Sequence, residues 1–155
     1  MLILDNIDLP YYPLGDETAS WYNIDDEWKN QEFISILMPL AGHMFPTERA
    51  VGYEIWEKDT DSPEHIDKDE ELIRTTGILS TPICSIIYYY EVSHLKGGEL
   101  VSPNNWTVTP KKNRLVIFAP HTSHLVPEFT GTRKAVLVNP WSSPLGSPPA
   151  SIGDV

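Results

Sequence analysis

The sequence predicts a mainly β protein in which one N-terminal helix supports a double-sheet jelly roll. After residue 50, about seven or eight short segments are rich in β-branched and aromatic residues, as strands are. Turn-forming residues separate these segments, and the chain holds 14 Pro and 9 Gly. Only one stretch, before residue 40, has clear helical periodicity. Many short strands after a single helix are typical of a jelly roll packed on a helix.

The N-terminal part is expected to hold a short strand, an irregular segment and the helix. Residues 2–4 are apolar enough for a strand, whereas Pro10, Pro13 and Gly15 interrupt any regular continuation. Asp25 and Asp26 are expected in the first turn of the helix, and Pro39 is expected to end or kink it. The apolar face of this helix would comprise Trp28, Phe33, Ile34, Leu37 and Met38.

The rest of the chain is expected to form strands joined by tight turns. The expected strands span residues 51–56, 83–90, 99–101, 106–109, 115–118, 125–129 and 134–138. The turn residues between them are Gly97-Gly98, Pro103-Asn104-Asn105, Pro110 to Asn113, and Thr130-Gly131. Strand alternation places Ser85, Ile87 and Tyr89 on one face, and Ile86, Tyr88 and Tyr90 on the other.

Length and composition indicate one domain. A chain of 155 residues with 41% hydrophobic residues can bury one substantial core and is too short for two ordinary domains. We expect residues 1–48 to support the β core, residues 49–141 to form it, and the Pro/Ser-rich residues 142–155 to form a surface tail. The oligomeric state is left open.

The net charge and the single cysteine restrict the class of partner and the compartment. A formal charge of −11 disfavours non-specific binding to nucleic acid or to an anionic membrane. Cys84 cannot form an internal disulfide and is expected to be a small buried strand residue. Residues 1–20 lack the features of a signal peptide, and no apolar stretch is long enough to span a membrane, so a cytoplasmic protein is expected.

The triplet His65-Ile66-Asp67 and the distant His124 suggest a metal site. On a strand, residues two apart point to the same face, which would bring the imidazole and the carboxylate together. Two histidines and one carboxylate form the ligand set of non-heme Fe(II) oxygenases. The triplet by itself also fits a solvated acidic loop that continues through Asp69, Glu70 and Glu71.

Arg133 strengthens the metal-site interpretation because it suggests a neighbouring anion site. It follows the expected Thr130-Gly131 turn, where a new strand would begin. A guanidinium group can hold a carboxylate through two parallel hydrogen bonds, which a lysine does less well.

Taken in order, these motifs resemble the Fe(II)- and 2-oxoglutarate-dependent oxygenases, most closely the prolyl-hydroxylase-like branch. The resemblance runs from about Gly52 to Trp141. The matching motifs are His65-Ile66-Asp67, Ile86 to Tyr90, Gly97-Gly98-Glu99-Leu100, Arg114 to Phe118, His124-Leu125-Val126-Pro127 and Gly131-Thr132-Arg133. The fold that this resemblance implies is a double-stranded β-helix, a cupin-like jelly roll.

The resemblance also implies roles for individual residues. His65, Asp67 and His124 would bind Fe(II), and Arg133 would pair with the far carboxylate of the co-substrate 2-oxoglutarate. Tyr89 would donate its hydroxyl to the same carboxylate. A one-residue slip in register would exchange it for Tyr88 or Tyr90, so these two stay open.

The implied reaction is hydroxylation of an unactivated C–H bond with O2, releasing succinate and CO2. Family members that halogenate typically lack the carboxylate that is present here as Asp67, so hydroxylation is expected. Prolyl, other peptidyl, free amino-acid and small-metabolite substrates are all open. Acidic residues in 57–64 and 69–71 would suit a cationic or peptide substrate. The alternatives are a cupin-like metal protein without oxygenase activity and a catalytically silent interaction module.

Other residues have ordinary interpretations. His121 is a rival to His124 as the third ligand, although only His124 precedes the Val-Pro continuation. His43 and His94 are expected in loops, and Trp56 and Tyr53 either line the pocket or pack in the core. The residues expected at a solvated hairpin tip are Lys111, Lys112 and Arg114.

Overall fold

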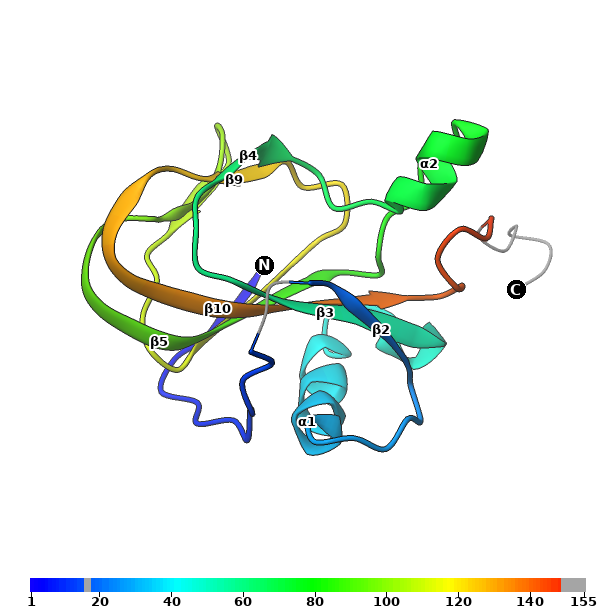
Figure 1. The fold of residues 1–155 in the computed structure, drawn as a ribbon, viewed down its shortest axis with the longest axis horizontal. Coiled ribbons are helices and arrows are strands. Elements are labelled where there is room, and N and C mark those ends of the chain that lie inside the picture. Colours follow the sequence, from blue (N-terminus) through cyan, green and yellow to red (C-terminus); the bar gives the residue numbers. More distant parts are fainter. Residues whose placement is uncertain (16–17, 149–155) are drawn as a thin grey trace.

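Two antiparallel sheets form the body of the protein, and the computed structural model describes residues 1–15 and 18–148 (Figure 1). In the described residues the larger sheet has the strand order β1 (Leu2–Leu4), β8 (Arg114–Phe118), β5 (Ser85–Gly97), β10 (Phe129–Trp141), β3 (Gly52–Lys58) and β2 (Ser20–Asn23). The smaller sheet has the order β4 (Ser62–His65), β9 (His124–Val126), β6 (Leu100–Ser102) and β7 (Trp106–Val108). This arrangement confirms the predicted jelly roll with a supporting helix.

The long strand β10 corrects the expected turn at Thr130-Gly131. Phe129 to Trp141 is one strand of 13 residues, and the register against β5 shifts between Thr130 and Thr132. Gly131 has φ +96, and a Cβ there would lie 2.2 Å from the carbonyl oxygen of His94. The glycine therefore forms a bulge rather than a loop. His94, expected in a loop, is part of β5, and Arg133 lies within β10 rather than at the start of a strand.

Helix α1 (Gln31–Ala41) packs against the outer face of the larger sheet (Figure 1). Its buried residues are Phe33, Ile34, Leu37, Met38 and Ala41, which confirms most of the predicted apolar face. Pro39 does not end the helix, which continues to Ala41, because a missing N–H near the last turn removes only one internal hydrogen bond. Asp25 and Asp26 precede the helix instead of lying in its first turn, and Asp26 accepts a hydrogen bond from the backbone of Asn23.

Three regular elements besides these were missed: strands β2 and β4, and helix α2 (Glu70–Thr76). Each is too short to show a clear hydrophobic period. Asp69 caps α2 by accepting a hydrogen bond from the Leu72 N–H at 3.0 Å, and Gly77 ends the helix with φ +74. A short 3₁₀ turn, Thr47–Arg49, follows α1.

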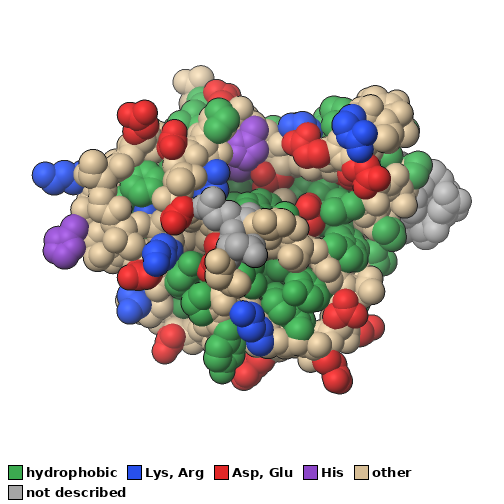
Figure 2. All heavy atoms as spheres, in the orientation of Figure 1, with side chains coloured by type: hydrophobic (Ala, Val, Ile, Leu, Met, Phe, Trp, Pro, Cys, Tyr) green, Lys and Arg blue, Asp and Glu red, His purple; other side chains and the backbone are tan. Residues whose placement is uncertain are grey.

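The acidic residues in 57–64 and 69–71 are solvated only in part: two of them, Glu57 and Asp69, are buried, whereas the exposed ones are Asp59, Asp61, Glu64, Glu70 and Glu71. Glu57 and Lys58 belong to β3, and residues 62–65 form β4. Glu57 is buried because two tyrosine hydroxyls and two backbone N–H groups donate to its carboxylate. Asp69 is also buried as a helix cap. Acidic side chains are spread over the face seen in Figure 2.

Apolar side chains form two clusters, one on each face of the larger sheet. The outer cluster packs against α1 and includes Ile86 and Tyr88, whereas the inner cluster lies between the sheets and includes Ile87 and Tyr89. The predicted alternation along this strand is therefore confirmed. Tyr53 belongs to the outer cluster and not to a pocket.

The structure also places Cys84, Arg114 and residues 142–148. Cys84 is buried but immediately precedes β5. Arg114 lies in β8, where its guanidinium group pairs with Asp5 at 2.6 Å rather than forming a solvated tip. Residues 142–148 have no helix or strand, and the Gly146 N–H donates to Asp69. The remainder of the expected tail, 149–155, lies outside the described residues. No helix in the described ranges is long and apolar enough to cross a membrane.

Candidate metal centre and co-substrate pocket

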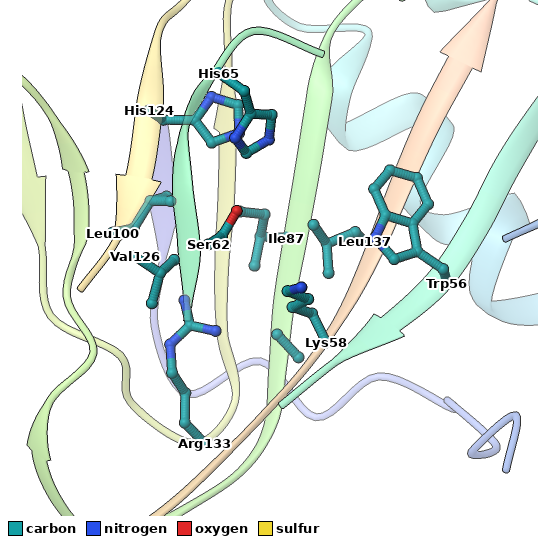
Figure 3. A pocket seen from close by; sticks show the side chains of 11 residues that line it. Trp56, Lys58, Ser62, His65, Ile87, Leu100, His124, Val126, Arg133 and Leu137 are labelled. Carbon is teal, nitrogen blue, oxygen red and sulfur yellow. The ribbon is translucent and has the colours of Figure 1, made fainter. Parts of the chain in front are cut away.

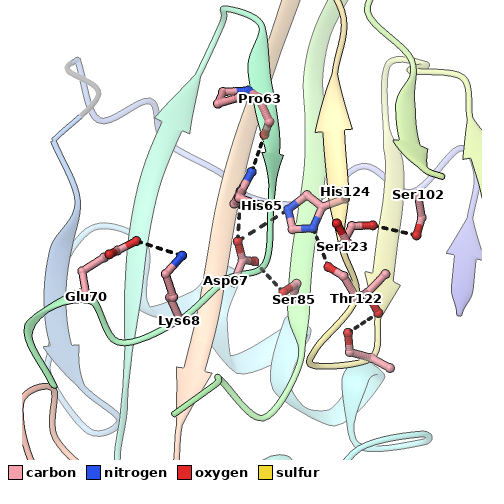
Figure 4. Close-up of polar contacts among 11 residues, drawn as sticks. Pro63, His65, Asp67, Lys68, Glu70, Ser85, Ser102, Thr122, Ser123 and His124 are labelled. Carbon is pink, nitrogen blue, oxygen red and sulfur yellow. Dashed lines mark hydrogen bonds and ion pairs between the residues drawn. The ribbon is translucent and has the colours of Figure 1, made fainter. Parts of the chain in front are cut away.

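The three predicted metal ligands lie close together at the end of β4 and the start of β9. His65 ends β4 and His124 begins β9, and the two are directly paired across these strands. Asp67 lies two residues beyond β4, so it does not share a strand with His65 as expected. Its Oδ1 is 3.4 Å from Nε2 of His65 and 3.5 Å from Nε2 of His124 (Figure 4). One potential ligand atom from each residue lies within 4.8 Å of the others.

Hydrogen bonds fix the orientation of each potential ligand. Nδ1 of His65 is 2.7 Å from the Pro63 carbonyl oxygen, and Nδ1 of His124 is 2.8 Å from that of Thr122. A carbonyl only accepts, so both Nδ1 atoms carry a proton, and Nε2 is the ring nitrogen that each histidine would offer to a metal ion. The hydroxyl of Ser85 donates to Oδ2 of Asp67 at 2.6 Å, which leaves Oδ1 facing the histidines.

The electrostatics keep Asp67 ionised. Burial by itself would raise the pKa of this carboxyl group, but its hydrogen bonds to His124, His65 and Ser85 outweigh burial and hold the pKa well below its usual range. The hydrogen bond to Asp67 raises the pKa of His65, against the opposing effect of burial. The site therefore presents a carboxylate to two imidazoles even without an ion.

The three residues fit a divalent transition metal. Two ligand atoms about 2.1 Å from one ion lie roughly 3.0–3.5 Å apart at octahedral or tetrahedral angles, which agrees with the Oδ1 to Nε2 separations. Backbone carbonyls on Nδ1 and a hydroxyl on the carboxylate are the outer partners that metal ligands usually have. Two histidines and one carboxylate also leave other coordination positions open.

A cavity of about 170 Å3 extends from the two histidines to Arg133 (Figure 3). It is lined by Trp56, Lys58, Ser62, His65, Ile87, Leu100, His124, Val126, Arg133, Ala135 and Leu137. In Figure 3 the histidines lie at one end and the guanidinium group at the other. The walls between them are mainly apolar, so a bound molecule would be shielded from water.

Arg133 is a buried cation without an acidic partner among the described residues. It is 3% exposed, its Nε donates to the Gly98 carbonyl oxygen at 2.8 Å, and its Nη2 is 3.3 Å from the Tyr89 hydroxyl. Burial lowers the pKa of this guanidinium group, although Tyr89 opposes that shift. Burying an unpaired charge is costly, so an anionic ligand would relieve the cost.

Of the three candidate tyrosines, Tyr89 is the one whose hydroxyl meets Arg133. The Tyr88 hydroxyl donates on the outer face, to the Ile7 carbonyl oxygen and the Asn113 side chain. The Tyr90 hydroxyl donates to Glu57. Burial raises the pKa of Tyr89 despite the opposing effect of Arg133, so its hydroxyl keeps the proton.

Lys58 is a site residue that the sequence interpretation missed. Its ammonium group points into the cavity (Figure 3), and it forms no ion pair in the part of the chain that the structure describes. The lining thus contains two cations and no acid. Alternation from Trp56 along β3 was the available signal, because residues two apart share a face.

A second cavity of about 240 Å3 lies on the other side of His65 and Trp56, which line both. Its remaining lining residues are Ala19, Glu54, Ile66, Asp67, Lys68, Glu70 and Asn139. Trp56 therefore lines both cavities, which is one of the two roles left open for it. Neither Glu54 nor Asn139 was a predicted site residue.

The other histidines lie away from the centre. His121 adopts φ +64 and has Nε2 3.3 Å from the Thr81 hydroxyl, so His124 and not His121 completes the cluster. His43 follows α1, as expected.

Comparisons with known proteins show the fold. A search of protein-family models gave no match, and neither did a search of curated proteins. A viral collagen prolyl hydroxylase from Paramecium bursaria Chlorella virus-1, solved as a 2-oxoglutarate complex, matches with a TM-score of 0.52 at 11% identity, over 81% of this chain and 78% of that one. A 2OG-Fe(II) oxygenase-family oxidoreductase from Burkholderia pseudomallei matches with 0.49 at 16% identity, over 92% and 77%.

A cupin-2 domain protein from Shewanella frigidimarina NCIMB 400 matches with a TM-score of 0.35 at 9% identity, over 57% of this chain and 69% of that one. The viral enzyme has the highest TM-score of the three. Its likeness shows that this chain has the jelly-roll fold on which that prolyl hydroxylase is built.

Proposed function

We propose that this protein is an Fe(II)- and 2-oxoglutarate-dependent dioxygenase that hydroxylates an unactivated C–H bond. One observation carries the proposal: the two histidines of the His65–Asp67–His124 cluster and the unpaired Arg133 line one small cavity. A metal ligand set at one end and an anion site at the other suit a short dicarboxylate that chelates the metal.

In this proposal each residue has one task. His65, Asp67 and His124 hold Fe(II), and Arg133 with the Tyr89 hydroxyl binds the far carboxylate of 2-oxoglutarate. Bound there with O2, the iron and co-substrate supply oxidative decarboxylation, which yields succinate, CO2 and a hydroxylated carbon. The apolar cavity walls exclude water from the reacting groups.

Hydroxylation is favoured over halogenation because the Asp67 carboxylate faces both histidines. With iron bound, this carboxylate would fill the coordination position that a halide would need, and the Ser85 hydrogen bond to Oδ2 would help to hold it there. A prolyl, other peptidyl or amino-acid substrate is compatible with this site.

The direct test is anaerobic addition of Fe(II) and 2-oxoglutarate, followed by O2. We expect an iron–2-oxoglutarate absorption band and then succinate, with neither formed by His65→Ala. Metal binding without 2-oxoglutarate binding would indicate the cupin-like metal protein instead. Absence of both would indicate the catalytically silent module.

A further inference from the structure

The second cavity contains an acid that has no cationic partner. Glu54 lines it from β3, and its Oε1 accepts a hydrogen bond from the indole N–H of Trp141 at 3.1 Å. The other two acids of the lining are already engaged: Asp67 faces the histidines, and Glu70 pairs with Lys68 at 3.5 Å. Burial raises the pKa of Glu54, and the neighbouring acids add to this effect while Trp141 opposes it.

Asn139 is a second polar group that this cavity offers to a ligand. It is 4% exposed and lies opposite Glu54 on the paired strands β10 and β3, so both side chains share the inner face. No hydrogen bond joins its side-chain amide to another described residue, and because no fully buried side-chain polar atom among those residues lacks a partner, the amide opens onto the cavity. An amide that opens onto a cavity is free to bond to water or to the polar group of a ligand.

Strand β3 contributes a charge of opposite sign to each of the two cavities. Glu54, Trp56 and Lys58 alternate onto the inner face, so the acid and the base lie on opposite sides of the indole. The cavity with Lys58 and Arg133 suits an anion, whereas the cavity with Glu54 and Asn139 offers carboxylate and amide oxygens to a hydrogen-bond donor. His65 lies between them, so a ligand in either cavity reaches the candidate metal centre.

We infer that the Glu54–Asn139 cavity binds the cationic group of the substrate, an ammonium or guanidinium group on a basic side chain. That the bound molecule is a substrate rests on the proposed oxygenase function. Binding of the cation itself does not require turnover. The Glu54 carboxylate neutralises the cation, the Asn139 amide oxygen accepts one of its N–H groups, and Trp56 forms an aromatic wall beside it.

Calorimetric titration with matched probes tests the inference. The probes are Nα-acetyl-L-arginine methylamide and its neutral citrulline analogue, and Nα-acetyl-L-lysine methylamide and its Nε-acetyl form. Each is titrated into the metal-free protein and, anaerobically, into protein with Fe(II) and 2-oxoglutarate. We expect at least one charged probe to bind about ten- to a hundredfold more tightly than its neutral partner.

Variants assign the discrimination to these residues. Glu54→Gln keeps an acceptor for Trp141 and should remove most of the preference for the charged probe. Glu32→Gln, an exposed acid on α1, removes the same charge elsewhere and should leave the preference unchanged. Asn139→Asp adds a carboxylate opposite Glu54 and should strengthen binding of the charged probe alone. Thermal unfolding checks that each variant is folded.

The outcomes separate this inference from the proposed function. Equal binding of charged and neutral probes, binding of none, or an unchanged preference in Glu54→Gln would overturn the inference even if succinate is formed. A charge preference that depends on Glu54, with no succinate, would support the cation site and overturn the oxygenase proposal.

Discussion

His65 and His124 lie directly opposite each other on β4 and β9, with ring centroids 4.4 Å apart. They are far apart in sequence, and one antiparallel pair of short strands brings them together. Because both rings are anchored through Nδ1 to backbone carbonyls, their Nε2 atoms turn toward the same point. The candidate metal centre is therefore preorganised by backbone geometry.

Replacing Arg133 should abolish co-substrate binding while sparing the metal centre. Arg133→Ala is expected to weaken 2-oxoglutarate binding by at least about thirtyfold, since removing one partner of a buried ionic hydrogen bond costs about 2–5 kcal/mol. Calorimetry would measure Fe(II) and 2-oxoglutarate affinity separately. Equal loss of both affinities would argue against an anion-binding role.

Lys58 should assist co-substrate binding, with a smaller effect because it is more exposed than Arg133. Lys58→Met keeps the aliphatic stem and is expected to raise the KM for 2-oxoglutarate by about three- to tenfold. Lys134→Met, which removes a half-exposed lysine paired with Glu91, is the matched control. A Lys58→Met enzyme with an unchanged KM would exclude this role.

Ser85 should tune metal affinity through Asp67. Ser85→Ala removes the 2.6 Å hydrogen bond to Oδ2 and frees the carboxylate to rotate. Loss of such an outer partner typically lowers metal affinity about 10- to 100-fold. Competition with a metal-binding dye would measure this change, and Ser93→Ala, an exposed position on the same strand, should have no effect.

The pH dependence of stability in the metal-free protein should report His65. Its pKa is raised in the folded state by Asp67, so its contribution is fully present below its unfolded pKa, about 6.5, and is lost as pH rises through the folded value. The lowered pKa of Asp67 acts in the opposite sense, with stability lost only as pH falls below about 3.9.

Urea unfolding, measured at a series of pH values from about 3.9 to mildly alkaline pH, would test this expectation. His65→Gln should flatten the decline in stability above about pH 6.5, whereas His43→Gln, at an exposed position, should not. Identical slopes for the two variants would contradict the coupling. Added metal should reverse the trend, because an imidazole must lose its proton to bind a metal.

Glu57 should be important for stability rather than for metal binding. Its carboxylate accepts hydrogen bonds from Tyr11, Tyr90 and the backbone of Leu14 and Gly15, which fastens the N-terminal segment to β3. Glu57→Ala would leave these donors unsatisfied and lower the free energy of unfolding by about 2–4 kcal/mol. Chemical denaturation would measure the loss, with Glu91→Ala as an exposed control; unchanged stability would contradict this role.

Part of the site was predictable because it depends on local rules. Alternation along residues 85–90 correctly separated Tyr89 from Tyr88 and Tyr90, since a strand turns successive side chains to opposite faces. The burial of two acidic residues was not predicted, because burial cannot be inferred from composition. Glu57 and Asp69 are acids that the fold buries with hydrogen-bond partners supplied by distant residues or by a helix end.

The sequence by itself determined the jelly-roll class, the alternation of its strands and the identity of the candidate ligands, because hydrophobic period and residue chemistry are local properties. Only the tertiary structure decided that Tyr89 meets Arg133, that Lys58 shares their cavity and that Glu54 lies opposite Asn139. Those relationships depend on strand register across the sheet. Register is set by packing and by bulges such as the one at Gly131, which no single segment encodes.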